Sequence, residues 1–420
     1  MIAAARDRGV WVGLALAALA GLIYWLANRL FDAGRGDFFY LADAFLHGRT
    51  WLTAPLGPND VIPIGGRYYV PFAPFPAIAL MPLVALIGPV TADQIESGVN
   101  AVLAAGCVAT CWWLLTRIGV RRLVDRAWLV ALLGFSTQIL WVTTRGGVWH
   151  TGQLIATILT FGCLIELFGR RRALLVGLLA GAAFLTRAPV AFAVPVYAIW
   201  LAWYADRPAR PPADGAGADG SESEAGAYIE GPPRSIPWRP WVLLGLGVAP
   251  SIVFFFAYNQ VRFGSPLESG YALATLPGWL LSQRDIGLFS VRHIPMNIDY
   301  FLLHLPWFLP TWPFLRPDGL GMSVLLTSPG LLFAVRADWR RPVAWFLVAA
   351  ALLVLIPTLL YYGGGWLQYG YRYFLDSVPF VMALCGLAAV ARGGVGWGWR
   401  LLILVGIVVM GIGVYWAYNL

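Results

Sequence analysis

A short polar stretch, GDFFYLADAFLHGR, interrupts an otherwise apolar chain at residues 36–49. It contains two carboxylates, Asp37 and Asp43, together with a histidine and an arginine. A carboxylate near a membrane–water boundary can act as a general base at neutral pH. Asp37 also follows Gly36 at the start of a predicted helix, where aspartate is a favoured N-cap. Two roles for Asp37 therefore stand side by side, whereas Asp43 and His47 form an ordinary solvated pair four residues apart.

Arginines within apolar segments are the second group that could do chemistry. Arg187 interrupts a long apolar run, and Arg372 lies in the sequence GYRYF. The planar guanidinium group suits phosphate oxygens, and an arginine at membrane depth is a functional candidate because its burial is costly. The structural alternatives are a polar kink at a helix corner for Arg187 and an interfacial anchor for Arg372.

Further side chains could contact a phosphate or a sugar. Arg284 and Arg292 are additional phosphate candidates, and Tyr371 could hydrogen-bond a phosphate or belong to an interfacial aromatic belt. His150 and His293 are candidates for substrate contacts, with a satisfied interfacial histidine as the simpler interpretation of each. The histidines are scattered without metal-ligand spacing, so the sequence predicts no metal site.

The composition indicates what kind of protein carries these residues. Hydrophobic residues make up 59% of the 420 and charged residues only 12%, whereas a soluble domain carries about 25% charged residues. Repeated continuous apolar runs predict an all-α polytopic membrane protein and argue against a β-barrel, whose strands alternate. All 29 basic residues are arginine. They cluster at the predicted span ends and form no nucleic-acid patch, so the lipid bilayer is an expected partner and nucleic acid is not.

The apolar runs predict about eleven transmembrane helices, with the N-terminus inside and the C-terminus outside. The first is predicted to be an uncleaved signal anchor. In this topology 18 of the 29 arginines lie inside, as the positive-inside rule requires. Residues 71–90 carry five prolines, so they are predicted to form a re-entrant or juxtamembrane segment on the outer face. The predicted spans lie near residues 10–31, 98–117, 127–144, 150–168, 173–186, 189–204, 241–259, 321–336, 343–361, 374–391 and 399–418.

The outer face is predicted to be built from two long segments, which carry several of the candidate residues. The N-terminal transmembrane block, residues 1–204, contains the first of them, the outer loop 32–97. A Pro-, Gly-, Ser- and acid-rich stretch, residues 205–240, predicts a disordered cytoplasmic linker. The C-terminal block, residues 241–420, contains the second outer segment, residues 260–320. Apolar residues at helical spacing in the first loop predict a short amphipathic helix along the outer membrane surface.

Four segments, in order, resemble motifs of the GT-C superfamily of integral-membrane glycosyltransferases. The resemblance is to its protein-mannosyltransferase-like and aminoarabinose-transferase-like members, and it covers most of the chain. The segments are GDFFYLADAFLHGR, GGRYYVPFAPFPAIALMPLVAL, ALLVGLLAGAAFLTRAPVAFAVP and WLQYGYRYFLDSVPFVMAL.

The resemblance implies transfer of a sugar, with inversion, from a polyprenyl-phosphate carrier to a lipid, glycan or protein acceptor. The implied location is the extracytoplasmic face of a bacterial inner membrane. The family's first-loop aspartate, taken as the base, maps onto Asp37, with Asp32 as the second candidate, and Tyr40 falls at the family's aromatic position as a substrate-binding candidate. No cofactor is implied, and a divalent cation is compatible with this donor class without being required. The chain departs from the family in the loop TTRGGVWHTGQ, which carries no second carboxylate.

The alternative function is a transporter or flippase that moves lipid-linked sugars without catalysis. Its motivation is the large number of predicted spans together with Arg187 at membrane depth. Against it stand the absence of a detectable internal repeat and the scarcity of carboxylates within the spans.

Overall fold

The chain is a bundle of long apolar helices. The computed structural model describes residues 2–30, 36–205 and 237–419, with side chains from Arg8 onward. Helices hold 69% of the residues and strands 3%, so the predicted helical membrane protein is confirmed at that level. Six helices are long and apolar enough to cross a membrane: α1 (Ile2–Asn28), α5 (Glu96–Ile118), α8 (Val148–Phe168), α11 (Trp238–Phe263), α15 (Pro342–Leu360) and α17 (Trp397–Ala417).

A seventh candidate span consists of α6 (Leu123–Phe135) and α7 (Ile139–Arg145), which are bent by 45° relative to each other. The predicted number of eleven spans is therefore not confirmed. Four further apolar segments of the described chain form helices of 10–17 residues, which are shorter than the ~20 residues that cross a bilayer unaided.

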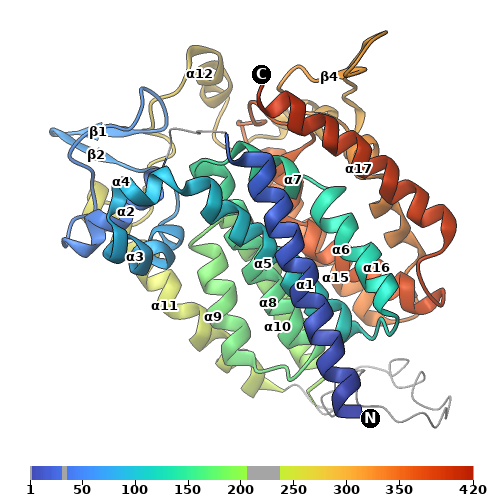
Figure 1. Ribbon diagram of the computed structural model, residues 1–420. Coiled ribbons are helices and arrows are strands. Elements are labelled where there is room, and N and C mark those ends of the chain that lie inside the picture. Colours follow the sequence, from blue (N-terminus) through green and yellow to red (C-terminus); the bar gives the residue numbers. More distant parts are fainter. Residues whose placement is uncertain (1, 31–35, 206–236, 420) are drawn as a thin grey trace.

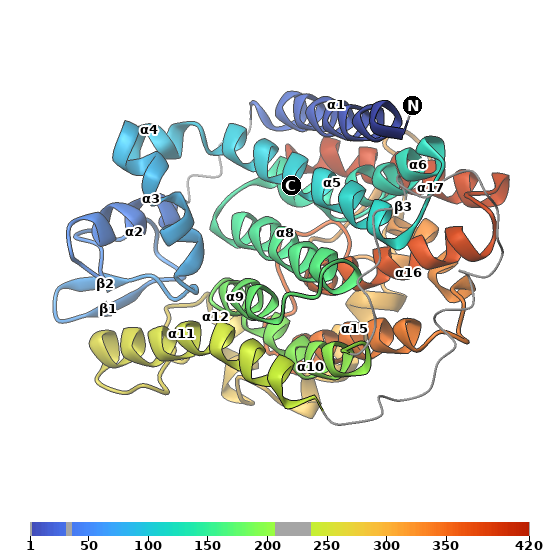
Figure 2. The same cartoon turned by 90° about the horizontal axis from the view of Figure 1, so that it is seen from below.

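Helix α8 lies at the centre of the bundle. In α8, 83% of the apolar 18-residue stretch is buried inside the structure. The corresponding share is 22% for α1 and 17% for α11. Figure 2 shows α8 between α5 and α9, with α1 and α17 on one side and α10, α11 and α15 on the other. The residues at the start of α8 are consequently within reach of several segments that are distant in sequence.

Two of the predicted spans meet at a break beside Arg187. α9 (Ala173–Phe184) ends before it, and the 3-10 helix η1 (Ala188–Ala193) and α10 (Val194–Trp203) follow. Arg187 itself has extended backbone angles, φ −149° and ψ 111°. Pro189, the second residue of η1, has no backbone N–H to donate to the preceding turn and its ring clashes with that turn, so an α-helix cannot simply continue through this position.

One predicted span, residues 321–336, is wrong as a continuous helix. The structure has a single turn, α14 (Val324–Thr327), followed by the 3-10 helix η6 (Pro329–Arg336). Ser328 between them is not helical, with φ −137° and ψ 50°. It precedes a proline, and that neighbour pushes a residue out of the α region. The predicted span 374–391 also begins differently. Its first residues belong to a 3-10 helix, η7 (Arg372–Asp376), and the α-helix that follows is α16 (Val378–Ala391).

The first outer loop folds into a small unit at the end of the bundle opposite the N-terminus (Figure 1). It contains α2 (Asp37–Leu46), the strands β1 (Ile62–Ile64) and β2 (Arg67–Tyr69), α3 (Phe75–Ile87) and α4 (Pro89–Gln94). The strands pair antiparallel around Gly65 and Gly66, whose φ angles of 56° and 74° are those of a tight hairpin turn. α3 has only 13 residues, which agrees with the prediction that residues 71–90 are not a full span.

Helix α2 packs its apolar face against protein. Phe38, Leu41 and Ala42 are buried as the periodicity predicts, but Phe39 and Ala44 are buried as well. They belong to an apolar cluster shared with α3 and α4. The periodicity identified the apolar face of this helix without indicating what covers it.

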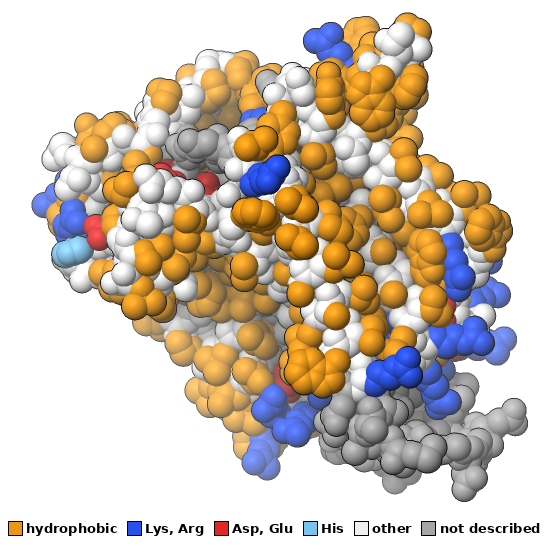
Figure 3. All heavy atoms as spheres, in the orientation of Figure 1, with side chains coloured by type: hydrophobic (Ala, Val, Ile, Leu, Met, Phe, Trp, Pro, Cys, Tyr) orange, Lys and Arg blue, Asp and Glu red, His pale blue; other side chains and the backbone are white. Residues whose placement is uncertain are grey.

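The second outer segment lies at the same end of the bundle (Figure 1). It runs through α12 (Gly278–Asp285), η4 (Val291–His293), α13 (Ile294–Ile298), the π-helical turn η5 (Asp299–Leu303), β3 (Trp307–Phe308) and β4 (Leu315–Arg316). Figure 3 shows arginine side chains gathered at the other end, around the N-terminus. Such a concentration of arginine at one end is the pattern that the positive-inside rule associates with a cytoplasmic side.

Helices from both predicted blocks pack directly on each other. A Cβ atom on Gly177 of α9 would overlap the backbone of α11 at Gly247, and one on Gly247 would overlap α9. Small residues of this kind let two helix backbones approach closely in membrane proteins. Residues 206–236 of the predicted linker lie outside the described residues, and the remainder, from Trp238, is already part of α11.

Candidate functional site

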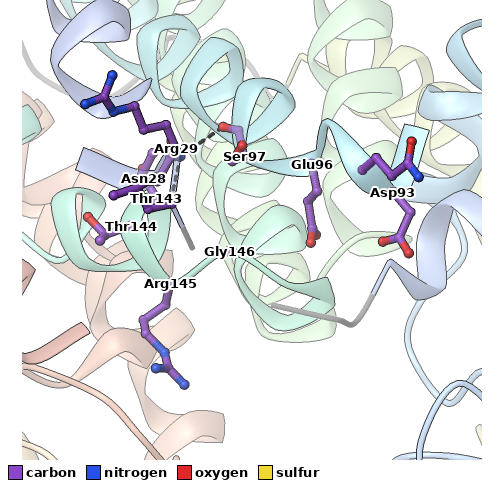
Figure 4. Close-up of a pocket in the computed structure, with 11 residues that line it drawn as sticks. Asn28, Arg29, Asp93, Glu96, Ser97, Thr143, Thr144, Arg145 and Gly146 are labelled. Carbon is purple, nitrogen blue, oxygen red and sulfur yellow. Dashed lines mark hydrogen bonds between the residues drawn. The ribbon is translucent and has the colours of Figure 1, made fainter. Parts of the chain in front are cut away.

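A polar cavity of about 270 Å³ opens at the end of the bundle that carries α2. Figure 4 shows Asp93 and Glu96 with their carboxylates pointing the same way, and Arg145 extending from α7. Asn28 joins three helices at the cavity wall. Its side-chain amide donates to the carbonyls of Ser97 in α5 (2.9 Å) and Thr143 in α7 (3.0 Å). The described lining residues are Asn28, Arg29, Leu30, Asp93, Gln94, Glu96, Ser97, Thr143, Thr144, Arg145 and Gly146.

Asp37 is buried next to this cavity, among other carboxylates. It is 4% exposed and is the first residue of α2, with Gly36 at the N-cap position. It is therefore not the N-cap that the sequence allowed, although a carboxylate in the first turn still interacts favourably with the helix dipole. Asp37 acts electrostatically on Glu96, and it is absent from the described residues that line the cavity.

Asp93 and Tyr40 connect α2 to the acidic group. The Tyr40 hydroxyl donates to Asp93 Oδ2 across 3.4 Å. Burial and the neighbouring Asp93 carboxylate raise the pKa of Tyr40. Gly36 allows the approach, because a Cβ atom at this position would overlap the Asp93 carboxylate. Asp37, Asp93 and Glu96 are called the acidic group below.

The acidic group reaches the first turn of the central helix through Glu96. The loop between α7 and α8 turns at Gly146 and Gly147, with φ angles of 60° and 89° that favour glycine. The backbone N–H of Gly147 hydrogen-bonds to the Glu96 carboxylate, and Thr151 Oγ1 lies 3.5 Å from Glu96 Oε1. A carboxylate at a helix N-terminus is stabilised by the unsatisfied N–H groups there.

Arg372 reaches the same turn of α8 from the other side. Its Nη1 donates to His150 Nε2 across 3.2 Å, and His150 Nδ1 is bonded to the Gly146 carbonyl. The carbonyl can only accept, so Nδ1 carries the proton and Nε2 is the acceptor for Arg372. Arg372 is 8% exposed, and its Nε is a buried donor with no hydrogen-bond partner within the described chain.

Two glutamines hold the backbone of Arg372. The Gln153 side chain donates to the Arg372 carbonyl across 2.9 Å. The backbone N–H of Arg372 donates to Gln368 Oε1 across 3.1 Å. Gln153 is one turn after His150 on α8, so the central helix contacts Arg372 twice. The residue is thus fixed at both its backbone and its guanidinium group, which limits the rotamers from which it could bind an anion.

Arg187 lies close by and is paired. Its Nε lies 2.6 Å from Asp376 Oδ1 and 2.9 Å from Oδ2. The side chain of Asp376 is 1% exposed and that of Arg187 is 17% exposed. The ring of Tyr373 has both guanidinium groups beside it, with Arg187 Cζ 5.7 Å and Arg372 Cζ 5.3 Å from its centroid. Arg187 and Arg372 are called the arginine pair below.

The other candidate residues lie outside this cluster of contacts. Tyr371 is fully buried and donates to Asn297 Oδ1 across 3.2 Å. Arg284 donates to the carbonyl of Ala274 across 2.7 Å, and His293 contacts the Gly287 carbonyl across 3.0 Å. These contacts shape the second outer segment, in keeping with the structural interpretation of His293.

The sequence also singles out Arg292, Asp32, Asp43 and His47. The side chain of Arg292 is exposed at the surface, and Asp32 lies outside the described residues. Asp43 and His47 form a solvated pair, with His47 Nδ1 3.5 Å from Asp43 Oδ1, as predicted. Among the residues that the structure describes, no three His, Cys, Asp or Glu side chains converge on a possible metal position.

Several residues of the site were missed by the sequence reasoning. Asp93 and Glu96 lie at the end of the first outer loop, where an apolar span begins, and such a position for a carboxylate is itself a signal. Asp376 lies four residues after Arg372 in the same motif. Gln153 and Gln368 carried no recognisable pattern.

No family model, no curated protein and no solved structure matches the chain. What the geometry offers is an acidic group and an arginine pair on opposite sides of the first turn of α8, where Thr151 faces Glu96 and its neighbour His150 faces Arg372. A carboxylate set can accept a proton, and guanidinium groups can stabilise a departing phosphate.

Proposed function

We propose that the chain is an inverting glycosyltransferase that moves a sugar from a polyprenyl-phosphate carrier to an acceptor hydroxyl at the extracytoplasmic membrane face. The observation that carries the proposal is the buried Nε of Arg372, a donor without a partner in the described chain. Arg372 contacts His150, and the buried Glu96 lies beside Thr151, so the two groups lie on opposite sides of the first turn of α8. A buried unsatisfied donor is costly, so a phosphate oxygen would remove that cost when it binds.

Each half of the site has a role in this reaction. A carboxylate takes the proton from the acceptor hydroxyl, with Asp37 of the acidic group as the leading candidate and Asp32 as the second. The oxygen then attacks the anomeric carbon, and the bond between that carbon and the phosphate oxygen breaks. Arg372 and Arg187 stabilise the negative charge that the lipid phosphate gains as it leaves.

The resemblance to the GT-C superfamily supports the same donor class, and its motifs coincide with the elements of the site. The first motif contains Asp37, the third contains Arg187 and the fourth contains Arg372 and Asp376. The proposal includes an inner-membrane location, about eleven membrane crossings when the shorter apolar segments are counted, and a lipid, glycan or protein acceptor. The charge difference between the two ends of the bundle supports an outer site at the α2 end.

Reconstitution tests the proposal against a transporter. The purified chain is placed in proteoliposomes with a panel of polyprenyl-phosphate hexoses and pentoses labelled in the sugar, and both product formation and carrier movement across the bilayer are measured. Transfer of label to an acceptor, lost on Arg372→Ala, supports the glycosyltransferase. Carrier movement without any glycosylated product contradicts it and favours the flippase.

A further inference from the structure

A β-hairpin, formed by β3 and β4, projects from the α2 end of the bundle (Figure 1). Residues 305–317 are called the aromatic arm below. Its strands pair antiparallel, with Phe308 opposite Leu315. Figure 3 shows apolar side chains over the projecting lobe at upper right. Four large rings, 52–69% exposed, belong to Trp307, Phe308, Trp312 and Phe314. An exposed apolar patch of this kind on a folded protein marks a contact surface.

The aromatic arm rests on the last turn of α17. The ring of Trp312 packs edge-on against Tyr415, with 6.1 Å between the centroids. Trp416 Nε1 donates to the Leu315 carbonyl across 2.5 Å. α17 is one of the candidate membrane spans and ends at Ala417, so the arm lies where this helix would leave the apolar layer of a bilayer.

The surface of α17 leads directly to the aromatic arm. Leu401, Leu404 and Val408 are exposed, and their spacing of three and four places them on one face of the helix. The same face continues at Tyr415, which touches the arm. In a membrane, such a face of a spanning helix contacts lipid tails.

We propose that the aromatic arm is a membrane-interface anchor, with its rings among the lipid headgroups and Arg316 beside their phosphates. Tryptophan and tyrosine are enriched at this depth because one part of each ring system is apolar and another is polar. Arg316 is exposed on β4, opposite Trp307 in the hairpin, and a cation there is attracted to anionic lipid. The proposal rests on the membrane location alone and is independent of the sugar transfer proposed above.

The base of the arm is held firmly enough to present these rings. His304 comes directly before the arm and Asp318 directly after it. The distance from His304 Nε2 to Asp318 Oδ2 is 2.6 Å. The other ring nitrogen lies 2.8 Å from Asp299. Both ends of the arm are thereby tied to the π-helical turn, which limits its movement relative to α17.

Site-specific labelling tests the anchor. The full chain carries Trp307→Cys, coupled to the polarity-sensitive fluorophore NBD, in liposomes of phosphatidylcholine and phosphatidylglycerol with or without spin-labelled lipid. The four native cysteines are buried, so the introduced thiol is the accessible one. Ser282→Cys on α12, an exposed position at the same end of the molecule, is the matched control. We expect blue-shifted emission and several-fold stronger quenching by spin-labelled lipid at position 307 than at position 282.

Three results would overturn the anchor. The first is quenching by aqueous iodide at position 307 as strong as at position 282, which would place the arm in water. The second is lipid quenching that is equal at the two positions. The third is efficient cross-linking between labelled copies, which would make the arm an interface between two molecules of this chain.

Trp312→Cys provides a second position on the arm if Trp307→Cys does not fold. Adding Arg316→Gln should weaken the emission shift that phosphatidylglycerol produces, and an unchanged shift would contradict the role of that cation.

Discussion

Arg372 donates from Nη1 to Nε2 of His150 across 3.2 Å, and so joins two residues that are 222 positions apart. The contact connects η7 to the first turn of the central helix α8. It orients a guanidinium group whose Nε has no partner within the described chain. A planar, pre-oriented fork of this kind is suited to two oxygens of one phosphate.

We predict that Arg372→Lys weakens donor binding although it keeps the positive charge. Lysine lacks the planar fork and cannot reproduce the contact with His150. A charged hydrogen bond contributes about 1.5–3 kcal/mol, so the KM for the polyprenyl-phosphate sugar should rise about 10- to 100-fold. The measurement is initial-rate kinetics in proteoliposomes over a range of donor concentrations.

Arg292→Lys is the matched control, since Arg292 is exposed on the same end of the molecule. Its donor KM should stay at the wild-type value. Equal effects of the two substitutions would indicate a general loss of surface attraction for the donor, and the specific role of Arg372 would be wrong.

The ion pair between Arg187 and Asp376 predicts a loss of stability in Asp376→Asn. The Asp376 side chain is 1% exposed and that of Arg187 is 17% exposed, so the substitution leaves a largely buried charge without its partner. Removing one member of a buried pair costs about 3–5 kcal/mol. Thermal unfolding in detergent should show a clearly lowered midpoint.

The double variant Arg187→Met with Asp376→Leu removes both charges and should recover much of that stability, because neither charge is left uncompensated. A double variant as unstable as Asp376→Asn alone would show that the pair is needed for another reason. The double variant should lack transfer activity if Arg187 contacts the lipid phosphate.

This pair also illustrates what the sequence could and could not predict. The spacing of apolar residues placed Arg187 at a break between two helices, and the break is there. Its partner could not be predicted, because Asp376 is 189 positions away and only the packing of the bundle brings the two together. Asp37 was identified from its position after the first span, whereas Asp93 and Glu96 were missed because their proximity depends on how α2 and α4 pack.

The packing of α9 on α11 predicts opposite effects at two glycines of the same helix. A Cβ atom at Gly247 would overlap the backbone of α9, whereas one at Gly245 would meet nothing within 4 Å. Gly247→Ala should destabilise the chain by about 1–3 kcal/mol through forced displacement of backbone. Gly245→Ala should be neutral or stabilising by up to about 1 kcal/mol.

Thermal midpoints of the two variants in one detergent provide the measurement. A neutral Gly247→Ala would mean that the two helices do not approach each other as closely as the structure has them. Equal destabilisation by both substitutions would point to a property of glycine within α11 itself.

The described helices show a second limit of the sequence. Apolar runs located the six helices that are long and apolar enough to cross a membrane, together with the bent pair of α6 and α7, since burial in lipid requires long apolar helices. The segment 321–336 has the right composition but forms two short helical pieces around Ser328. Hydropathy averages over a window and does not register that Pro329 breaks the hydrogen-bond ladder.

His304 predicts a dependence of stability on pH. Burial lowers its pKa, but hydrogen bonds and charge interactions with Asp318 and Asp299 outweigh burial and raise it above the ordinary value. A histidine with a raised pKa in the folded state contributes stability that is complete below the unfolded pKa of about 6.5 and is lost as the pH rises through the folded value. Tyr300, whose ring lies 5.5 Å from His304, also faces this group.

The check compares wild type with His304→Gln by thermal unfolding between about pH 5.5 and 9. Wild type should be the more stable at the acid end, and the difference should shrink towards the alkaline end. A difference that is constant, or that grows with pH, would contradict the ionic contribution of His304.

Sugar transfer by Asp37→Asn, measured in proteoliposomes beside Asp43→Asn, tests the central claim most directly. Asparagine has nearly the size of aspartate and keeps one carbonyl oxygen as an acceptor, but it has no carboxylate that could take the proton. Asp43 belongs to the solvated pair with His47 and serves as the control. A catalytic carboxylate at position 37 predicts that Asp37→Asn folds, retains the donor KM and loses about 10²- to 10⁴-fold in kcat, while Asp43→Asn stays at the wild-type rate. Wild-type transfer by folded Asp37→Asn would contradict the assignment.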